Sequence, residues 1–282
     1  MESRTWLRRL HPRDVAGGRR GPATGAGRLG ADRPRRTRLV CCPHSGGWAE
    51  SFLPWRDHLR GLGDEAGGGG VDLLAVQYPG HGGRSAERPT ADVHAIADAV
   101  QAELTALPPA RLLLFGHSFG AMVAYETARR LESAGRPPAV LAVSGARAPG
   151  DPAVRLGDAA LPDEQLWRRI AQLGGLHPLV AAEPELRALV LPALRADIAA
   201  HERYVSAPPP APISTSIRCY VGADDPLAPA AAAPGWAART TGRTVVRARR
   251  GGHFHLFDLP GELLADLLAE PAGTGTEEAV WA

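Results

Sequence analysis

The segment Leu112-Leu113-Leu114-Phe115-Gly116-His117-Ser118-Phe119-Gly120-Ala121 decides how this chain folds. Its first four residues form a continuous apolar run, which suits a strand that is buried on both faces of a sheet. From Ala121 to Leu131, apolar residues recur at helical spacing, so a helix is expected next. Between the two stands Ser118, with a glycine two residues away on either side. The segment therefore predicts a strand, a sharp turn that carries one hydroxyl, and a helix.

Apolar runs of strand length and segments of helix length alternate on both sides of that turn. This alternation predicts an α/β fold, with one mostly parallel central sheet flanked by helices. The expected strands cover residues 38–42, 71–78, 111–116, 139–144, 216–222 and 244–248. The expected helices include residues 90–107 and 121–134.

One stretch, from about residue 150 to 212, breaks the alternation because it contains no strand pattern. Two amphipathic helices are expected there, over residues 163–173 and from 183 to about 203. A helical insertion between two strands is typical of a lid over the edge of the sheet that carries an active site. We therefore predict a single domain over residues 37–270 that includes this helical lid.

The two ends of the chain are expected to lie outside that domain. Residues 1–36 carry ten arginines and many glycines without any periodicity, which predicts a disordered tail. Residues 271–282 are expected to be a flexible C-terminal tail.

The composition excludes several classes of function. The chain has 282 residues, of which 44% are hydrophobic, enough for one sizeable core. A net charge of +2 gives no reason to expect nucleic-acid binding by the whole chain. The sequence contains no lysine, which excludes a Walker-type phosphate loop and a pyridoxal Schiff base, since both need a lysine amine.

The sequence also indicates the cellular compartment of the protein. No run approaches the roughly 18 apolar residues that a membrane span needs, and no apolar stretch follows Arg8-Arg9 to make a secretion signal. The three cysteines, Cys41, Cys42 and Cys219, lie in apolar runs, which indicates core residues in a reducing cytoplasm. We therefore predict a cytoplasmic protein.

The turn at Ser118 carries the strongest chemical signal. Gly116-His117-Ser118-Phe119-Gly120 has the strand–turn–helix context of the nucleophile elbow of the α/β-hydrolase fold. Small residues at both ends let neighbouring backbone pass close, so that the serine hydroxyl stands clear at a helix N-terminus. The alternative is an ordinary strand–helix turn in which the serine only caps the helix.

A nucleophilic serine needs a base and an acid, which in this fold follow in the order acid, then histidine. Gly251-Gly252-His253 follows the last expected strand and supplies His253 as the base, with His255 as the local competitor. Asp225 lies just beyond the strand 216–222 and precedes a proline, so we predict it as the acid, with Asp224 as the alternative.

The oxyanion of the reaction needs two backbone donors. One is predicted to be the N–H of Phe119, next to the nucleophile, and the other the N–H of Ser45, in the loop after the first expected strand. His44 in the same loop is expected to shape the loop and not to act as a base. The spacing of His44, His81 and His117 matches no zinc pattern, so no metal is predicted, and the chemistry calls for no cofactor.

Several motifs together resemble the type II thioesterases that accompany polyketide synthases and nonribosomal peptide synthetases. The resemblance runs from about residue 37 to 268. Its motifs are Cys42-Pro43-His44-Ser45-Gly46-Gly47 with Phe52 and Trp55, Gln77-Tyr78-Pro79-Gly80-His81-Gly82, Gly116–Ala121, Asp225-Pro226, Gly251–Phe254, and in the lid residues 161–175 and 191–197.

The resemblance implies a role that residue spacing alone does not. Such enzymes hydrolyse stalled or wrong acyl groups from the phosphopantetheine arms of acyl or peptidyl carrier proteins. It also implies Ser118, Asp225 and His253 as the triad, with oxyanion donors at Ser45 and Phe119.

The chain departs from the family pattern at three positions, and other functions compete. Ser45 stands where the family usually has alanine, Trp48 replaces a small residue, and His81 replaces a common arginine. Trp48 is expected either to reshape the acyl pocket or to pack under the lid. The alternatives are a chain-releasing thioesterase, a carboxylesterase or lipase, and an inactive scaffold that binds carrier proteins.

Overall fold

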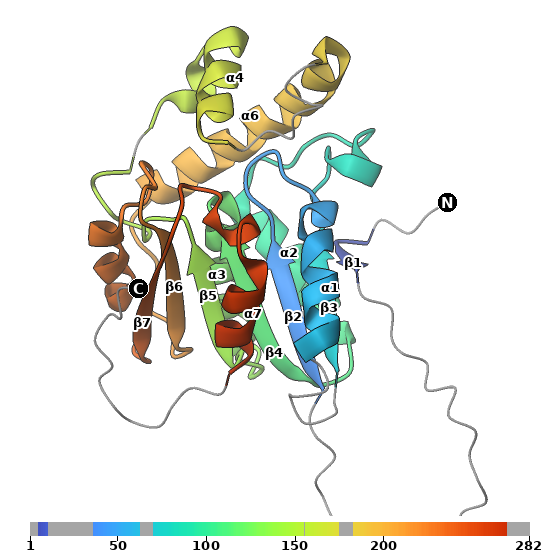
Figure 1. Ribbon diagram of the computed structural model, residues 1–282, viewed down its shortest axis with the longest axis vertical. Coiled ribbons are helices and arrows are strands. Elements are labelled where there is room, and N and C mark those ends of the chain that lie inside the picture. Colours follow the sequence, from blue (N-terminus) through green and yellow to red (C-terminus); the bar gives the residue numbers. More distant parts are fainter. Residues whose placement is uncertain (1–4, 11–35, 63–69, 155, 175–182, 270–282) are drawn as a thin grey trace, which may run out of the picture.

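The computed structural model describes residues 5–10, 36–62, 70–154, 156–174 and 183–269. Its centre is a sheet of seven strands in the order β1-β3-β2-β4-β5-β6-β7 (Figure 1). The six strands from β2 to β7 are parallel, and β1 is antiparallel to β3. Parallel neighbours need crossover connections, which the helices between them provide. The expected α/β fold with a mostly parallel sheet is confirmed.

The elements have the following bounds. The strands are β1 (Leu7–Arg9), β2 (Thr37–Cys42), β3 (Val71–Val76), β4 (Arg111–His117), β5 (Val140–Ser144), β6 (Ile217–Gly222) and β7 (Thr244–Arg249). The α-helices are α1 (Leu53–Leu62), α2 (Val93–Ala106), α3 (Phe119–Ser133), α4 (Asp163–Gln172), α6 (Pro184–Ser206) and α7 (Pro260–Leu268). Short 3-10 helices are η1 (Ala49–Phe52), η2 (Gly82–Arg84), η3 (Asp158–Ala160), η4 (Ala230–Arg239) and η5 (His255–Phe257).

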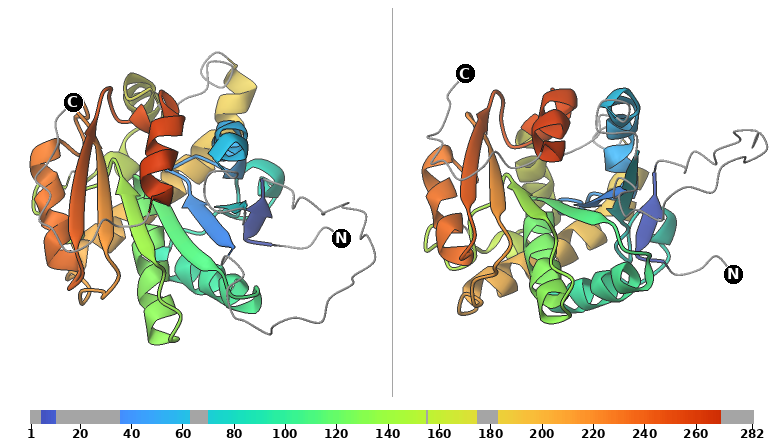
Figure 2. Two further views of the ribbon diagram at one scale, coloured as in Figure 1. Left: turned by 60° about the horizontal axis from the view of Figure 1, so that its bottom comes forward. Right: turned by 90° about the horizontal axis from the view of Figure 1, so that it is seen from below.

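Helices cover both faces of the sheet (Figure 2). Successive residues of a strand point to opposite faces. Along β2, Leu39 and Cys41 therefore pack in the cluster that contains residues of α1 and α7, whereas Val40 and Cys42 pack in the cluster of α2 and α3. Burial on both sides explains why these strands read as continuous apolar runs.

The expectation of a disordered tail over residues 1–36 is corrected for residues 5–10. Leu7–Arg9 form the edge strand β1, and the amides of Trp6 and Leu7 donate to the carboxylate of Glu103 on α2. Arg9 also pairs with the buried Asp72 of β3. A three-residue strand is too short to show alternation, and its partners lie more than 60 residues away. Residues 11–35, the Gly67–Gly70 connection up to residue 69, and the predicted tail 271–282 lie outside the described residues.

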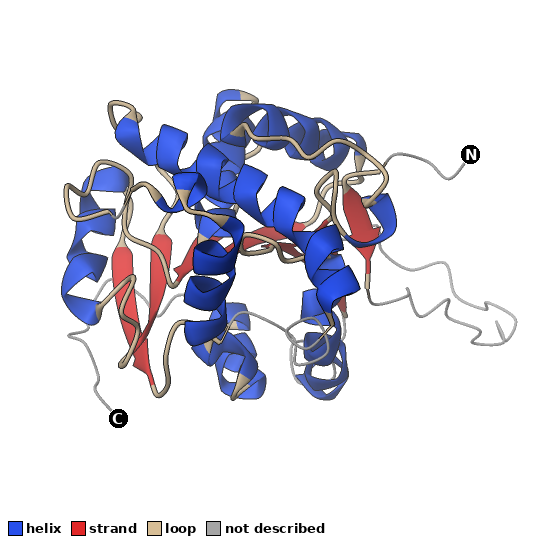
Figure 3. Ribbon diagram, turned by 90° about the horizontal axis from the view of Figure 1, so that it is seen from above, coloured by secondary structure: helices blue, strands red, loops and turns tan. Residues whose placement is uncertain are grey.

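The predicted lid is present as helices α4 and α6, which lie above the carboxyl edge of the sheet (Figures 1 and 3). They share a small apolar core of their own, made of Leu166, Trp167, Leu191, Leu194 and Ile198. None of the helices in the described ranges is long and apolar enough to cross a lipid bilayer.

Candidate active site

The turn between β4 and α3 holds Ser118 in a strained conformation. Ser118 has φ 54° and ψ −119°, and among the described residues no other non-glycine residue has a positive φ. An L-amino acid in this region is disfavoured by about 1–3 kcal/mol, so the surrounding structure must enforce it. This is the backbone geometry expected of a nucleophile elbow and not of an ordinary capping serine.

Two glycines make this turn sterically possible. A Cβ on Gly116 would overlap the carbonyl of Gly120, and a Cβ on Gly120 would overlap the carbonyl of Cys42 at the end of β2. The Ser118 N–H donates to the carbonyl of Ser144 at 2.8 Å. The elbow is thus clamped between the ends of β2 and β5, with its hydroxyl half-buried at the wall of a cavity.

The predicted acid and base meet at the same edge of the sheet. His253 Nδ1 lies 2.9 Å from Asp225 Oδ2, and both side chains are buried. Asp225 Oδ1 accepts from the amides of Leu227 (2.8 Å) and Ala228 (3.2 Å). Burial alone would raise the pKa of Asp225, but the hydrogen bond from His253 and these two amides lower it. Because an ionised carboxylate only accepts, Nδ1 carries the proton and Nε2 is left to act as a base.

The two local alternatives occupy different places. Asp224 is exposed. His255 is buried, its Nε2 lies 3.2 Å from Ser144 Oγ, and it is not among the side chains that line the cavity. Burial, with the charge of Arg249, lowers the pKa of His255 to about 4. The geometry therefore favours Asp225 over Asp224 and His253 over His255.

Ser118 and His253 line one cavity, but no hydrogen bond joins them in the part of the chain that the structure describes. Catalytic hydrogen bonds are often long before substrate binds and shorten in the substrate complex. The structure thus brings Ser118 and the Asp225–His253 pair to one site, without a hydrogen bond between Ser118 and His253.

The predicted oxyanion loop follows β2 and faces the elbow. Its Gly47 N–H bonds to the carbonyl of His44 at 2.9 Å, and its Gly46 N–H donates to Asp197 Oδ2 at 2.8 Å. Within the described residues, the N–H groups of Ser45 and Phe119 have no hydrogen-bond partner. Ser45 lines the cavity, and Phe119 begins helix α3, where first-turn amides point out of the helix. Both predicted donors are therefore available to an oxyanion.

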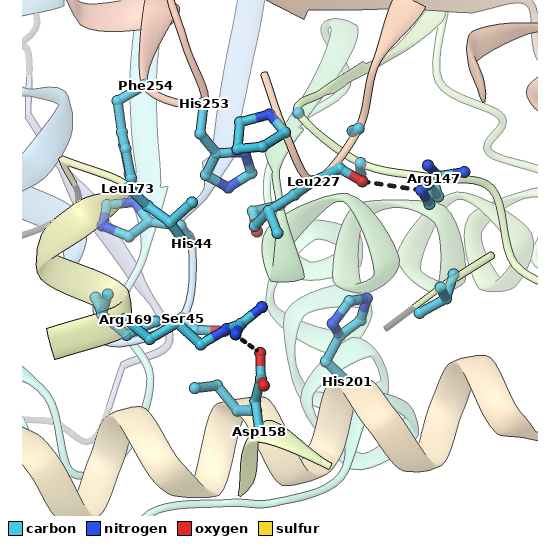
Figure 4. A pocket seen from close by; sticks show the side chains of 18 of the residues that line it. His44, Ser45, Arg147, Asp158, Arg169, Leu173, His201, Leu227, His253 and Phe254 are labelled. Carbon is cyan, nitrogen blue, oxygen red and sulfur yellow. Dashed lines mark hydrogen bonds and ion pairs between the residues drawn. The ribbon is translucent and has the colours of Figure 1, made fainter. Parts of the chain in front are cut away.

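The cavity of about 570 Å³ runs from the triad to the lid (Figure 4). This volume lies in the range typical of small-molecule sites. Its apolar lining includes Ile170 of α4, Leu173 directly after that helix, and Ile198 of α6. In Figure 4 the side chains of Arg169, from α4, and His201, from α6, also point inward.

The polar side chains that the lid segment contributes to the cavity were not predicted from the sequence. Arg169 pairs with Asp158 at 2.8 Å, and burial with the nearby His253 lowers the pKa of His201 to about 4, so that this imidazole is neutral. A signal for His201 exists, since it lies three residues after Ile198 and seven after Leu194 on the face of α6 that points inward. No comparable local pattern marks Arg169.

The structure shows the surroundings of Trp48 and His81, two of the departures from the family pattern. Trp48 lies beside Gly82, where an added Cβ would come within 3.4 Å of its side chain, and it is not among the residues that line the cavity. The structure therefore does not support a direct role of Trp48 in shaping the acyl pocket. His81 is buried and faces Asp197 of α6 at 2.9 Å.

Comparison with known proteins agrees with this architecture. Residues 37–269 match the family described as "Thioesterase domain". The chain is 36% identical over 272 residues to the thioesterase PikA5 of Streptomyces venezuelae, covering 95% of this chain and 85% of that relative.

Two solved structures of thioesterases are also similar to this chain. The type II thioesterase BorB from the borrelidin biosynthetic cluster has a TM-score of 0.74 and 33% identity, covering 95% of this chain and 100% of that one. The RedJ thioesterase from the prodiginine pathway of Streptomyces coelicolor has a TM-score of 0.71 and 34% identity, covering 86% of this chain and 96% of that one.

Proposed function

Since this chain belongs to the Thioesterase domain family, we propose that it is a type II thioesterase of a polyketide or nonribosomal peptide assembly line. It hydrolyses stalled or wrong acyl groups from the phosphopantetheine arms of carrier proteins. The observation that carries the proposal is the strained Ser118 on the wall of a cavity that is also lined by His253, the partner of Asp225.

The first half-reaction transfers the acyl group to the enzyme. His253 Nε2 takes the proton of Ser118 Oγ as the oxygen attacks the thioester carbonyl. The N–H groups of Ser45 and Phe119 stabilise the negative charge on the carbonyl oxygen. The C–S bond then breaks, the leaving sulfur takes the proton from His253, and the pantetheine arm departs as a thiol.

The second half-reaction releases the acid. His253 removes a proton from water, which attacks the acyl-serine ester through a second oxyanion. The ester bond breaks, the proton returns to Ser118 Oγ, and the free acid leaves. Asp225 holds the imidazole in the tautomer that both steps need and stabilises its cation. This chemistry requires neither a metal nor a cofactor, and that is part of the proposal.

The lid supplies the remaining requirements. Helices α4 and α6 shield the ester from bulk water, and they must move to admit a pantetheine arm. A cytoplasmic location is also part of the proposal, and the three cysteines, free and buried in the described structure, are compatible with it.

The test is a release assay on a panel of carrier proteins loaded with different acyl groups, with free acyl-thioester mimics and oxygen esters alongside. We expect hydrolysis of several short acyl groups, faster from carrier proteins than from mimics, and none above background with Ser118→Ala. A preference for one long acyl chain would instead indicate product release. Faster turnover of oxygen esters would indicate a carboxylesterase, and retained hydrolysis by Ser118→Ala would overturn the nucleophile assignment.

A further inference from the structure

Asp197, on the lid helix α6, joins three segments that are far apart in the sequence. Its Oδ2 accepts the N–H of Gly46 in the oxyanion loop at 2.8 Å. The same oxygen lies 2.9 Å from Nε2 of His81, in the loop after β3. Asp197 is 1% exposed and His81 3% exposed. A carboxylate this deeply buried needs its partners, because an unpaired buried charge is strongly unfavourable.

The surroundings of His81 determine its charge. Its Nδ1 lies 2.9 Å from the carbonyl of Pro79, and its Nε2 faces the carboxylate of Asp197. Both neighbours are acceptors, so both ring nitrogens donate, and His81 is an imidazolium cation paired with Asp197.

The charged groups around His81 support this protonation state. Burial alone would lower the pKa of His81, but Asp197 and the carbonyl of Pro79 outweigh it and raise the pKa, against the opposing charge of Arg84. The other titratable groups that face the ring are Tyr78, with ring centroids 5.6 Å apart, and His44.

The same face of α6 also packs on the oxyanion loop. Leu194 lies one helical turn before Asp197, and a Cβ added to Gly46 would come within 3.1 Å of its Cδ1. Gly46 has φ +74°, a conformation that favours glycine. The lid thus holds Gly46 through one apolar contact and one hydrogen bond.

These contacts restrain the backbone next to the Ser45 amide. Gly46 N–H belongs to the peptide plane that begins at the carbonyl of Ser45, so holding this N–H fixes the backbone of Ser45 on its C-terminal side. It also removes Gly46 N–H from competition for the oxyanion, and Ser45 N–H remains as the donor beside the elbow.

We infer that Asp197 is a positioning residue, which aligns the Ser45 N–H for the oxyanion when α6 is seated and is itself held by His81. The inference rests on the proposed function in that it takes Ser45 N–H as an oxyanion donor. It couples the position of the lid to catalysis. When α6 moves away, Asp197 moves with it, and the oxyanion loop loses the acceptor that orders Gly46.

Kinetics of Asp197 variants test the inference. Asp197→Ala should lower kcat by about 10²–10³, the effect of losing one oxyanion donor, with a smaller change in KM. Asp197→Asn keeps an oxygen that can accept from Gly46 N–H and should retain kcat to within about tenfold. Arg195→Gln, which breaks an ion pair to Asp163 within the lid, is the matched control and should leave kcat within about twofold.

The rate of Ser118 labelling by a fluorophosphonate is the second readout, since that reaction also develops charge in the oxyanion hole and needs no thioester. We expect the same order, wild type and Arg195→Gln above Asp197→Asn above Asp197→Ala. If wild type reacts with the fluorophosphonate but hydrolyses no carrier-bound thioester, the proposed function fails and the labelling series still decides the role of Asp197. Equal labelling and equal kcat in Asp197→Ala and wild type would overturn the inference.

A pH profile separates positioning from a purely structural role. His81 has a raised pKa, so its cation is present at lower pH and is lost as the pH rises through that value. Wild type should therefore lose activity on an alkaline limb. His81→Gln keeps an uncharged donor and should lack that limb. An identical alkaline limb in both proteins would overturn the part assigned to His81.

Discussion

The proposed nucleophile elbow and the proposed oxyanion loop face each other across the candidate active site, yet they are held in different ways. The elbow is fixed by its own glycines and by backbone at the ends of β2 and β5. The oxyanion loop is fixed by side chains from elsewhere: Tyr78 Oη donates to the carbonyl of Pro43 (3.1 Å), and Asp197 accepts from Gly46. The partner of Gly46 lies 151 residues away in the sequence.

A short sequence motif can therefore specify the elbow but not the oxyanion loop. The elbow is a local device, so substitutions within it should act on folding or on the nucleophile itself. The oxyanion loop depends on tertiary contacts. Substitutions far away in the sequence should therefore lower kcat by weakening oxyanion stabilisation, while the nucleophile itself stays in place.

The largest effect is expected from the acid that serves the elbow. Asp225→Asn should lower kcat by about 10⁴, because the imidazole loses the partner that sets its tautomer. Asp224→Asn, one residue away and exposed, is the control and should change kcat less than twofold. Steady-state hydrolysis of an acyl thioester measures both, and the reverse order would assign the acid to Asp224.

A methyl group within the elbow should disrupt packing. Gly120→Ala should destabilise the fold by about 3 kcal/mol or more, because its Cβ would overlap the carbonyl of Cys42. Gly235→Ala is the control, since its Cβ would meet Ala148 at an ordinary 3.5 Å. Denaturant unfolding compares the two variants, and equal stabilities would show that the elbow is not clamped as described.

Removing the second oxyanion donor should affect rate. Ser45→Pro lacks the N–H and should lose about 10²–10³ in kcat, whereas Ser45→Ala keeps the amide and should retain activity. Thermal unfolding of both variants checks that the loop change leaves the fold intact. A Ser45→Pro enzyme that is folded and within tenfold of wild type would place the second donor elsewhere.

The buried His255, which packs below the elbow, should make the stability of the fold depend on pH. His255 packs against Ser144, whose carbonyl accepts the Ser118 N–H, and its pKa is lowered to about 4 by burial. The unfolded chain takes up this proton near pH 6.5 and the native protein only near pH 4, so stability falls as the pH drops between these values.

This effect can be measured as the slope of the free energy of unfolding against pH between pH 4 and 6.5. His255→Gln should lower this slope by up to about 1.4 kcal/mol per pH unit, which corresponds to the uptake of one proton on unfolding. Leu189→Gln, at an exposed position without a titratable group, is the control and should leave the slope unchanged. An unchanged slope in His255→Gln would mean that this histidine is not held neutral by the fold.

The smallest effect is expected at the base of the oxyanion loop. Tyr78→Phe leaves the carbonyl of Pro43 without its donor and should lower stability by about 1–2 kcal/mol and kcat by less than tenfold. Tyr125→Phe removes a similar hydroxyl, which donates to the backbone carbonyl of Arg239 and belongs to a residue that does not line the cavity, and it should lower stability without changing kcat. If kcat stays unchanged in both, Tyr78 does not order the loop.

The parts of the molecule that could be predicted from sequence are those whose structure is determined by residues close together in the chain. The six parallel strands were predicted to within about two residues at each end, because burial on both faces leaves long apolar runs. The lid helices were predicted from their apolar faces. The triad residues were predicted from their positions after strands, and the fold brings Asp225 and His253 into contact.

The parts that escaped prediction depend on partners far along the chain. Strand β1 is held by Glu103 and Asp72, and nothing within Leu7–Arg9 indicates either partner. The pair of His81 and Asp197 spans 116 residues, and although His81 stood out as a departure, its own segment does not reveal its partner. Such contacts are set by tertiary packing and leave no local period.

The central claim, that Ser118 attacks the thioester, is tested most directly by trapping the acyl-enzyme. An acyl-loaded carrier protein is mixed with the enzyme, quenched rapidly, and digested after arginine, which releases residues 112–129 as one peptide. We expect the mass of this peptide to increase by one acyl group at Ser118, and no such increase in Ser118→Ala. An acyl group on a different residue, or hydrolysis by Ser118→Ala at the wild-type rate, would contradict the account.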